Sequence, residues 1–399
     1  MSVRTLLLYL LGSPRAILDI ASDRRAVGLG FLFVLSAGFA REYDGQDLLH
    51  EPWHLLIPVG ASLLTSFLFF SLTYGVVRVK TEGPPFFTAY RSFLGLFWMT
   101  APLAWLYAIP YERFLSAPGA MQANLWTLGL VSLWRVFLMV RVISVLMGYR
   151  TIAALCLVMA LADVEALVAI QFLPVPLIDV MAGLRLSESE ALLRGTALEV
   201  AFLGGCTLLG WMTGAAVAAV VSKPGWQGLP LEAYQPKTRD RGLSILAWAS
   251  VVFWFFVLPF TQPEQLMRCK VERDLRQGRI EQALATMSEH SLNDFPPHWD
   301  PPPRWGYIGQ PPSLFHVLDT IVDHPPALWV RSAYLSKFER ALDVEYPPFR
   351  REDYLRIASL LERLPEGPRL TEMVANRGWK RFLEGPRHES EERQDQSKK

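Results

Sequence analysis

The chain has 399 residues, 51% of them apolar, and its mean hydropathy of +0.22 is higher than that of an ordinary soluble domain. The formal net charge of +1 argues against nucleic acid as a partner, because a protein that binds phosphates along a strand needs a strongly basic face. The three cysteines match neither a disulfide framework nor zinc-ligand spacing, and we expect no bound cofactor or metal.

Charge is distributed unevenly along the chain. Residues 1–260 hold 18 Lys and Arg and 16 Asp and Glu, whereas residues 261–399 hold 21 and 22. Just over a third of the chain therefore carries more than half of its charge. This division predicts a membrane-embedded part followed by a part that lies in water.

The first 25 residues predict a region at the membrane interface. The apolar run in MSVRTLLLYLLGSPRA is short and lacks a good cleavage site, so we expect the segment to be retained rather than removed as a signal peptide. Ser13 and Pro14 form a good N-cap and first-turn pair, which predicts a helix to about Arg25 lying on the membrane face.

About seven apolar segments follow, most of them near the 20 residues that a helix needs to cross hydrocarbon. The first is short, so whether it crosses fully stays open. We assign 26–173 to a first membrane region of about five segments and 174–260 to additional membrane segments. The segments are 26–40, 55–77, 88–109, 124–147, 151–173, 196–222 and 242–260.

The Lys and Arg residues of the short loops predict the orientation, because positive loops tend to stay in the cytoplasm. The amino end and the second, fourth and sixth loops carry twelve cations, and the other three loops carry four. The amino end is therefore predicted in the cytoplasm. After seven crossings the tail is predicted outside it, and an error of one segment would reverse the side of the tail.

Small residues recur every four positions in the sixth segment, at Gly210, Gly214 and Ala218. Such a stripe lets two membrane helices approach closely, and we interpret it as a helix-packing surface.

The tail, 261–384, predicts a small all-helical soluble domain whose helices are separated by proline pairs. The sequence GRIEQAL within it resembles one helical-repeat unit of the tetratricopeptide type, but it occurs once. FPPHWDPPPRWGY favours a stiff connector lying over its own domain, and a segment gripped by another protein is the alternative. Residues 385–399 lack apolar anchors, and we predict that they are disordered. The predicted fold class is all-α.

The motif His50-Glu51-Pro52-Trp53-His54 has the H-E-x-x-H pattern of a zinc metalloprotease. Pro52 argues against that function, because it removes a backbone donor and places His50 outside any helix that begins at the proline. We interpret Glu51 as a cap, Pro52 as the first helical residue, and His54 as a residue of the interface. A membrane zinc protease is a third and minor hypothesis.

Three charged residues fall well inside the predicted membrane segments. Segments four and five are joined by a short turn, which makes them antiparallel neighbours and places Arg135 and Asp163 at equal depth, with Glu165 close enough to share the arginine. We favour a structural pair that fixes helix register. A polar site of a transporter or channel is the alternative.

From about residue 13 to residue 157 the chain resembles the Yip family of polytopic membrane proteins. The likeness is carried by SPRAILDIASDRR, PPFFTAYRSFLGLFWMTAPLAWLYAIP and NLWTLGLVSLWRVFLMVRVISVLMGYR. The resemblance implies a core of about five membrane segments, and in eukaryotic members an association with small Rab GTPases. Two further segments and the tail depart from that pattern.

We therefore expect a non-enzymatic membrane scaffold whose soluble helical domain contacts other proteins, with the lipid bilayer as its surrounding. A bacterial inner membrane is favoured over a eukaryotic endomembrane, because the polar tail is predicted outside the cytoplasm. A transporter or channel that uses Arg135, Asp163 and Glu165 is the alternative function.

Overall fold

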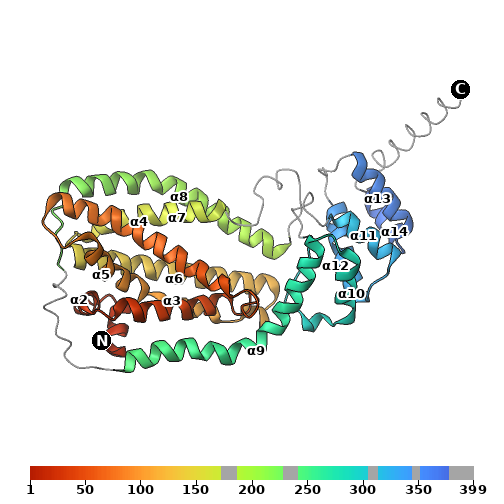
Figure 1. The fold of residues 1–399 in the computed structure, drawn as a ribbon. Coiled ribbons are helices and arrows are strands. Elements are labelled where there is room, and N and C mark those ends of the chain that lie inside the picture. The colour runs from red at the N-terminus through yellow and green to blue at the C-terminus, as the bar shows by residue number, and fades with distance from the viewer. Residues whose placement is uncertain (172–186, 228–240, 304–312, 344–350, 377–399) are drawn as a thin grey trace. The chain divides into compact units, whose positions relative to one another are not determined.

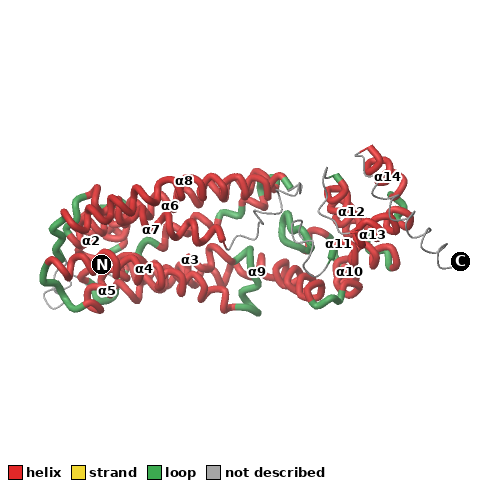
Figure 2. The backbone as a smooth tube through the Cα atoms, turned by 90° about the horizontal axis from the view of Figure 1, so that it is seen from above, coloured by secondary structure: helices red, strands yellow, loops and turns green. Residues whose placement is uncertain are grey.

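The computed structural model describes residues 1–171, 187–227, 241–303, 313–343 and 351–376. Within these ranges all regular structure is helical, as Figure 2 shows. The chain forms two compact units: unit 1 comprises Met1–Leu173 and Gly195–Gln265, and unit 2 comprises Pro174–Arg194 and Leu266–Lys399. The predicted all-α fold is confirmed. The tail predicted as disordered, 385–399, lies outside the described residues.

Unit 1 is a bundle whose long helices run side by side in both views (Figures 1 and 2). Its elements are α1 (Val3–Leu10), α2 (Pro14–Ser22), α3 (Ala26–Glu42), η1 (Pro52–Leu55), α4 (Leu56–Lys80), α5 (Phe86–Trp98), η2 (Ala101–Ala108), η3 (Tyr111–Arg113), α6 (Ala117–Met147), α7 (Thr151–Gln171), α8 (Glu188–Val221) from Gly195 onward, and α9 (Gly242–Arg276) as far as Gln265.

Six stretches of the described chain are long and apolar enough to cross a membrane, which confirms a multi-pass architecture. They are Pro52–Lys80, Phe86–Arg113, Ala117–Met147, Thr151–Gln171, Glu188–Val221 and Gly242–Arg276. The second is a composite, because α5 ends at Trp98 and the 3₁₀ helix η2 completes it. The predicted segment that is not among these six is the first, 26–40; it forms α3, whose 17 residues span about 25 Å, a little less than the hydrocarbon of a bilayer.

The amino-terminal segment forms a hairpin of α1 and α2 that packs into the bundle. Gly12 makes the turn at φ +77°, a backbone conformation that favours glycine. Tyr9 is fully buried and donates a 2.7 Å hydrogen bond to the carbonyl of Leu96, while Trp134 donates to the carbonyl of Leu10. The hairpin thus belongs to the main apolar core of unit 1. Its predicted contact with the membrane face stays a prediction.

Hydrogen bonds between loops define two ends of unit 1. At one end, which we call the basic end, Arg91 donates to the carbonyl of Arg24, Lys80 donates to those of Val220 and Ser222, and the amide of Gly225 donates to Met147. This end holds residues 1–25, 78–91, 147–151, 222–227 and 241. At the other end, which we call the acidic end, lie residues 43–51, 108–116 and 261–265, joined by bonds such as Tyr43 to the carbonyl of Ala108.

Helix α3 runs from the basic end to the acidic end, since it follows Arg25 and precedes Tyr43. It therefore traverses the same bundle as the longer helices despite its length. The neighbouring α5 approaches it closely: an ideal Cβ on Gly30 would lie 2.7 Å from the Cβ of Trp98, and one on Gly95 would lie 2.9 Å from that of Ala26. Glycine at these two positions permits the close packing.

Unit 2 contains successive helical hairpins. The end of α9 is followed by α10 (Ile280–Glu289), α11 (Leu314–Asp323), α12 (Leu328–Leu342), α13 (Arg351–Arg363) and α14 (Gly367–Asn376). Gly278, at φ +76°, ends α9 with a Schellman motif in which the amide of Arg279 donates to the carbonyl of Asp274. α11 packs against both α12 and α13, and α14 packs against both α12 and α13. Each hairpin therefore stacks on the next, as in an α-solenoid.

The described part of the proline-rich segment lies over its own domain, as the connector interpretation predicts. Tyr334 donates to the carbonyl of Pro302 at 2.8 Å, and the Trp299 ring stacks on Phe295 at a centroid distance of 4.5 Å. Lys337, with a side chain only 1% exposed, pairs with Asp300 at 2.8 Å and donates to the carbonyls of Pro301 and Pro303.

Candidate functional site

The predicted intramembrane cation, Arg135, lies on α6 beside aromatic side chains. Its guanidinium is 5.4 Å from the centroid of the Phe97 ring, a cation–π geometry. Tyr107, Glu165 and Tyr9 are the groups within its electrostatic range. In the described part of the chain no acid lies within 4.0 Å of this guanidinium.

The predicted pair of Arg135 and Asp163 is not formed. Asp163 is buried and accepts a 2.7 Å hydrogen bond from Thr207 of α8, whereas Glu165 accepts one from Thr65 of α4. Residues two apart on a helix point about 200° away from each other, so Asp163 and Glu165 cannot face the same neighbour. α6 and α7 do pack as adjacent helices. Their antiparallel register sets depth, but it does not set the direction in which each side chain points.

The small-residue stripe of α8 packs at two of its three predicted positions. An ideal Cβ on Gly214 would lie 2.7 Å from the Sγ of Cys156 on α7, and Ala218 is buried. Gly210 is exposed, and a Cβ there would meet nothing within 4 Å. Positions four apart rotate by about 40° around a helix, which carries the stripe away from α7.

The H-E-x-x-H motif does not bring its two imidazoles together. The 3₁₀ helix η1 begins at Pro52, and His50 lies before it, as the proline argument predicts. His50 Nδ1 lies 2.9 Å from Asp47, and His54 Nε2 lies 3.2 Å from Glu51, so each imidazole has its own carboxylate. Glu51 occupies the N-cap position but makes no side-chain capping bond. Among the described residues no group of three or more metal-ligating side chains is found.

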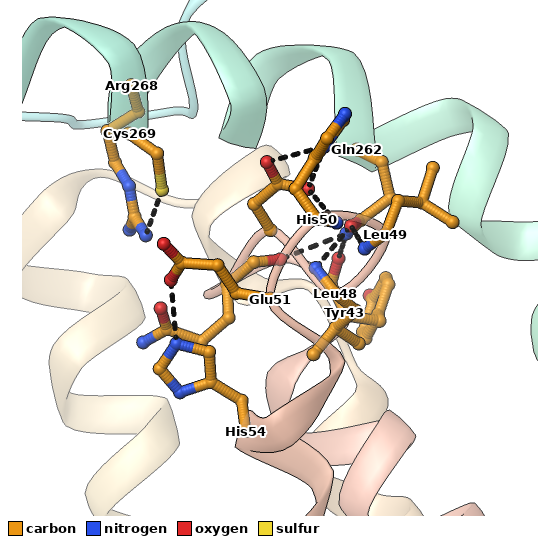
Figure 3. Close-up of polar contacts among 11 residues, drawn as sticks. Tyr43, Leu48, Leu49, His50, Glu51, His54, Gln262, Arg268 and Cys269 are labelled. Atoms are coloured by element: carbon orange, nitrogen blue, oxygen red, sulfur yellow. Dashed lines mark hydrogen bonds and ion pairs between the residues drawn. The ribbon is translucent and has the colours of Figure 1, made fainter.

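A polar clamp at the acidic end joins α9 to the loop that follows α3, residues 43–51 (Figure 3). The Gln262 amide donates to the carbonyls of Tyr43 and Gln46 at 2.9 and 3.0 Å, and its oxygen accepts from the backbone amides of Leu48 and Leu49 at 2.6 and 3.2 Å. Its side chain therefore uses both halves of the amide at once, and Gln262 is only 2% exposed.

Three neighbours of Gln262 on α9 extend the clamp. Thr261 donates to the carbonyl of Tyr43 at 2.7 Å, and Gln265 donates to that of Asp44. Glu264 accepts a charge-assisted hydrogen bond of 2.8 Å from Arg113, which is the last residue of the apolar stretch Phe86–Arg113. Sequence reasoning missed this clamp. Its signal is the polar run Thr-Gln-Pro-Glu-Gln, 261–265, directly after an apolar segment.

Asp44, whose backbone carbonyl belongs to the clamp, has a carboxyl group that binds a proton more tightly than usual. Its pKa is raised from 3.8 to about 6, first by burial and then by the negative charges of Glu112 and Glu42. A hydrogen bond from its own backbone amide and the positive charge of Arg113 oppose the rise. The clamp thus holds a group that titrates close to neutral pH.

Comparison with protein-family models, with curated proteins and with solved structures found no match.

Proposed function

We propose that the chain is a non-enzymatic membrane scaffold whose helical bundle anchors the stacked hairpins of unit 2 for contact with other proteins. The observation that carries the proposal is that α9 supplies the last apolar span of unit 1, and its residues from Leu266 onward belong to unit 2. The clamp ties α9 to the outer loops at the point where it leaves unit 1. Stacked helical hairpins expose long surfaces that suit protein recognition.

The proposed orientation places the basic end in the cytoplasm and unit 2 outside it. The four cation-rich regions of the sequence meet at one end of unit 1, and α3 connects the two ends, which supports an odd number of crossings. A bacterial inner membrane fits this arrangement. The likeness to the Yip family stays a proposal.

Cysteine labelling tests the orientation. We would place a single cysteine at the exposed Ser332 of α12, in a chain whose three native cysteines are replaced, and treat intact cells with an impermeant thiol reagent. Labelling before lysis is expected. A cysteine at the exposed Lys223 of the basic end is the matched control and should react only after lysis. The reverse pattern would show that the orientation is wrong.

Site-specific photocrosslinking tests the scaffold function. A photoreactive residue in place of Leu328, which is 78% exposed at the start of α12, should give a discrete adduct with a second protein in intact cells. The same residue in place of Leu133, 69% exposed on α6, is the control and should give no protein adduct. Absence of an adduct at Leu328 and also at the exposed Leu292 would contradict the scaffold proposal.

A transporter or channel is the second candidate, favoured by the position of Arg135 within a span and without an ion pair among the described residues. Charged groups at such depth are costly and are usually functional. The variants Arg135→Glu and Glu165→Arg distinguish the roles. If the longer-range attraction between Arg135 and Glu165 stabilises the fold, each variant lowers the thermal midpoint and the double variant restores it, whereas a transport site predicts folded variants that do not recover flux.

A further inference from the structure

The basic end carries far more positive charge than the protein itself neutralises. Together with Arg141 of α6, its described residues include eleven Lys and Arg and three Asp and Glu. Within this described set, Arg25 is the side chain that forms an ion pair, with Asp23 at 3.0 Å. Arg78, Lys80, Arg91 and Arg141 donate to backbone carbonyls, which leaves their charge uncompensated. A negatively charged partner is therefore expected at this end.

The α1–α2 hairpin presents an apolar edge beside these cations. Leu7, Leu8 and Leu11 are 56%, 40% and 69% exposed, although the opposite face of the hairpin is in the core. Phe137 of α6, 47% exposed, continues the edge, because its ring lies 3.1 Å from the position of a Cβ on Gly12. An apolar edge on a membrane protein fits an acyl chain.

Arg141 lies where this edge meets the charged end. Its Nε donates to the carbonyl of Gly12 at 3.3 Å, which fixes the guanidinium at the tip of the hairpin. Arg141 precedes the end of α6 at Met147 by six residues, about 9 Å along the axis, so its long side chain can reach the headgroup layer. Arg15, in the first turn of α2, is exposed next to the same tip.

We propose that the α1–α2 hairpin and α6 form a binding site for an anionic phospholipid of the leaflet at the basic end. Arg141 and Arg15 hold the phosphate, and the edge of Leu7, Leu8, Leu11 and Phe137 contacts an acyl chain. Charge complementarity selects an anionic lipid over a zwitterionic one, because the site offers two cations. Asp19 lies one turn after Arg15 on the same face of α2, but it forms no ion pair with Arg15 within 4.0 Å.

Lipid retention tests the site. The purified full-length protein would be equilibrated in mixed micelles with phosphatidylglycerol and phosphatidylcholine of the same acyl chains, and the bound lipid measured by native mass spectrometry. The wild type should retain phosphatidylglycerol preferentially. Arg141→Gln and Arg15→Gln should each weaken that preference by about fivefold.

Lys223→Gln is the matched control, because it removes one exposed positive charge from the same end outside the hairpin. It should leave the preference unchanged. Leu11→Gln changes no charge at an exposed position and should reduce retention of both lipids, which keeps the test informative if Arg141→Gln fails to fold. An equal loss in the Lys223 variant, or no preference in the wild type, would overturn the proposal.

Discussion

Replacing Asp44 by asparagine should change the pH dependence of stability at the acidic end. The folded state raises the pKa of Asp44 to about 6, above its ordinary value of 3.8, so the folded protein takes up a proton that the unfolded chain does not yet bind. Stability from this group therefore increases as the pH falls through about 6 and is lost as the pH rises through it. Asp44→Asn, which is never charged, should remove this dependence.

The magnitude follows from the size of the pKa change. A rise of roughly 2 units corresponds to about 3 kcal/mol at most, and partial exposure of Asp44 to solvent reduces this to about 1–2 kcal/mol. At about pH 7.5 the variant should be more stable than the wild type by that amount, and at about pH 4 the two should be similar. Thermal unfolding of the full chain in detergent, followed by tryptophan fluorescence, measures the difference.

Asp19→Asn is the control, because Asp19 is exposed on α2 at the other end of unit 1. The difference between this variant and the wild type at the two pH values is the baseline against which Asp44→Asn is compared. If Asp44→Asn showed no more pH dependence relative to the wild type than the control, burial beside Glu112 would not be raising the proton affinity of Asp44, and our reasoning about the clamp would be wrong.

Three further predictions concern single side chains. Gln262→Ala should destabilise the full chain by about 3 kcal/mol in denaturant unfolding, because it leaves buried backbone groups of the loop after α3 without partners; an unchanged midpoint would show that the clamp contributes nothing. Thr207→Val should cost about 1–2 kcal/mol in the same assay by removing the donor to buried Asp163, whereas Asp163→Asn should cost less because an amide oxygen remains. Lys337→Met should increase proteolytic cleavage between α10 and α11 by freeing the proline-rich segment, and resistance equal to the wild type would contradict this role.

The sequence predicts the helices of this protein well because apolar runs of sufficient length, bounded by proline and charge, leave few alternatives. α7 begins at Thr151, as the predicted segment 151–173 does, and the described helices of unit 2 fall within the tail predicted to be all-helical. The sequence also predicts which loops lie at the same end of unit 1, because the Lys and Arg content of each loop can be read without knowing how the helices pack. The hairpin of α1 and α2 did not follow, because a short apolar run does not reveal whether it packs on lipid or on protein.

The arrangement of side chains around each helix could not be predicted. In a soluble helix a polar stripe marks the outside, but α6 and α7 are apolar on all sides, so no periodicity reveals which face Arg135 or Asp163 occupies. The close contacts between α3 and α5, at Gly30 and Gly95, involve one glycine on each of two helices and not a stripe of glycines on one helix. The clamp was equally hidden, since Gln262 acts on backbone groups more than two hundred positions away.

The surroundings of α3 bear on the order in which the protein assembles. Ser36, at its centre, donates to the carbonyl of Ser250 and accepts hydrogen bonds from the indoles of Trp105 and Trp254, and Phe39 stacks on Trp254. These partners on α9 are synthesised more than two hundred residues after α3. In the nascent chain Ser36 therefore lacks the carbonyl of Ser250 and the indole of Trp254 until α9 has been synthesised, so the packing around α3 is completed only by the last membrane helix.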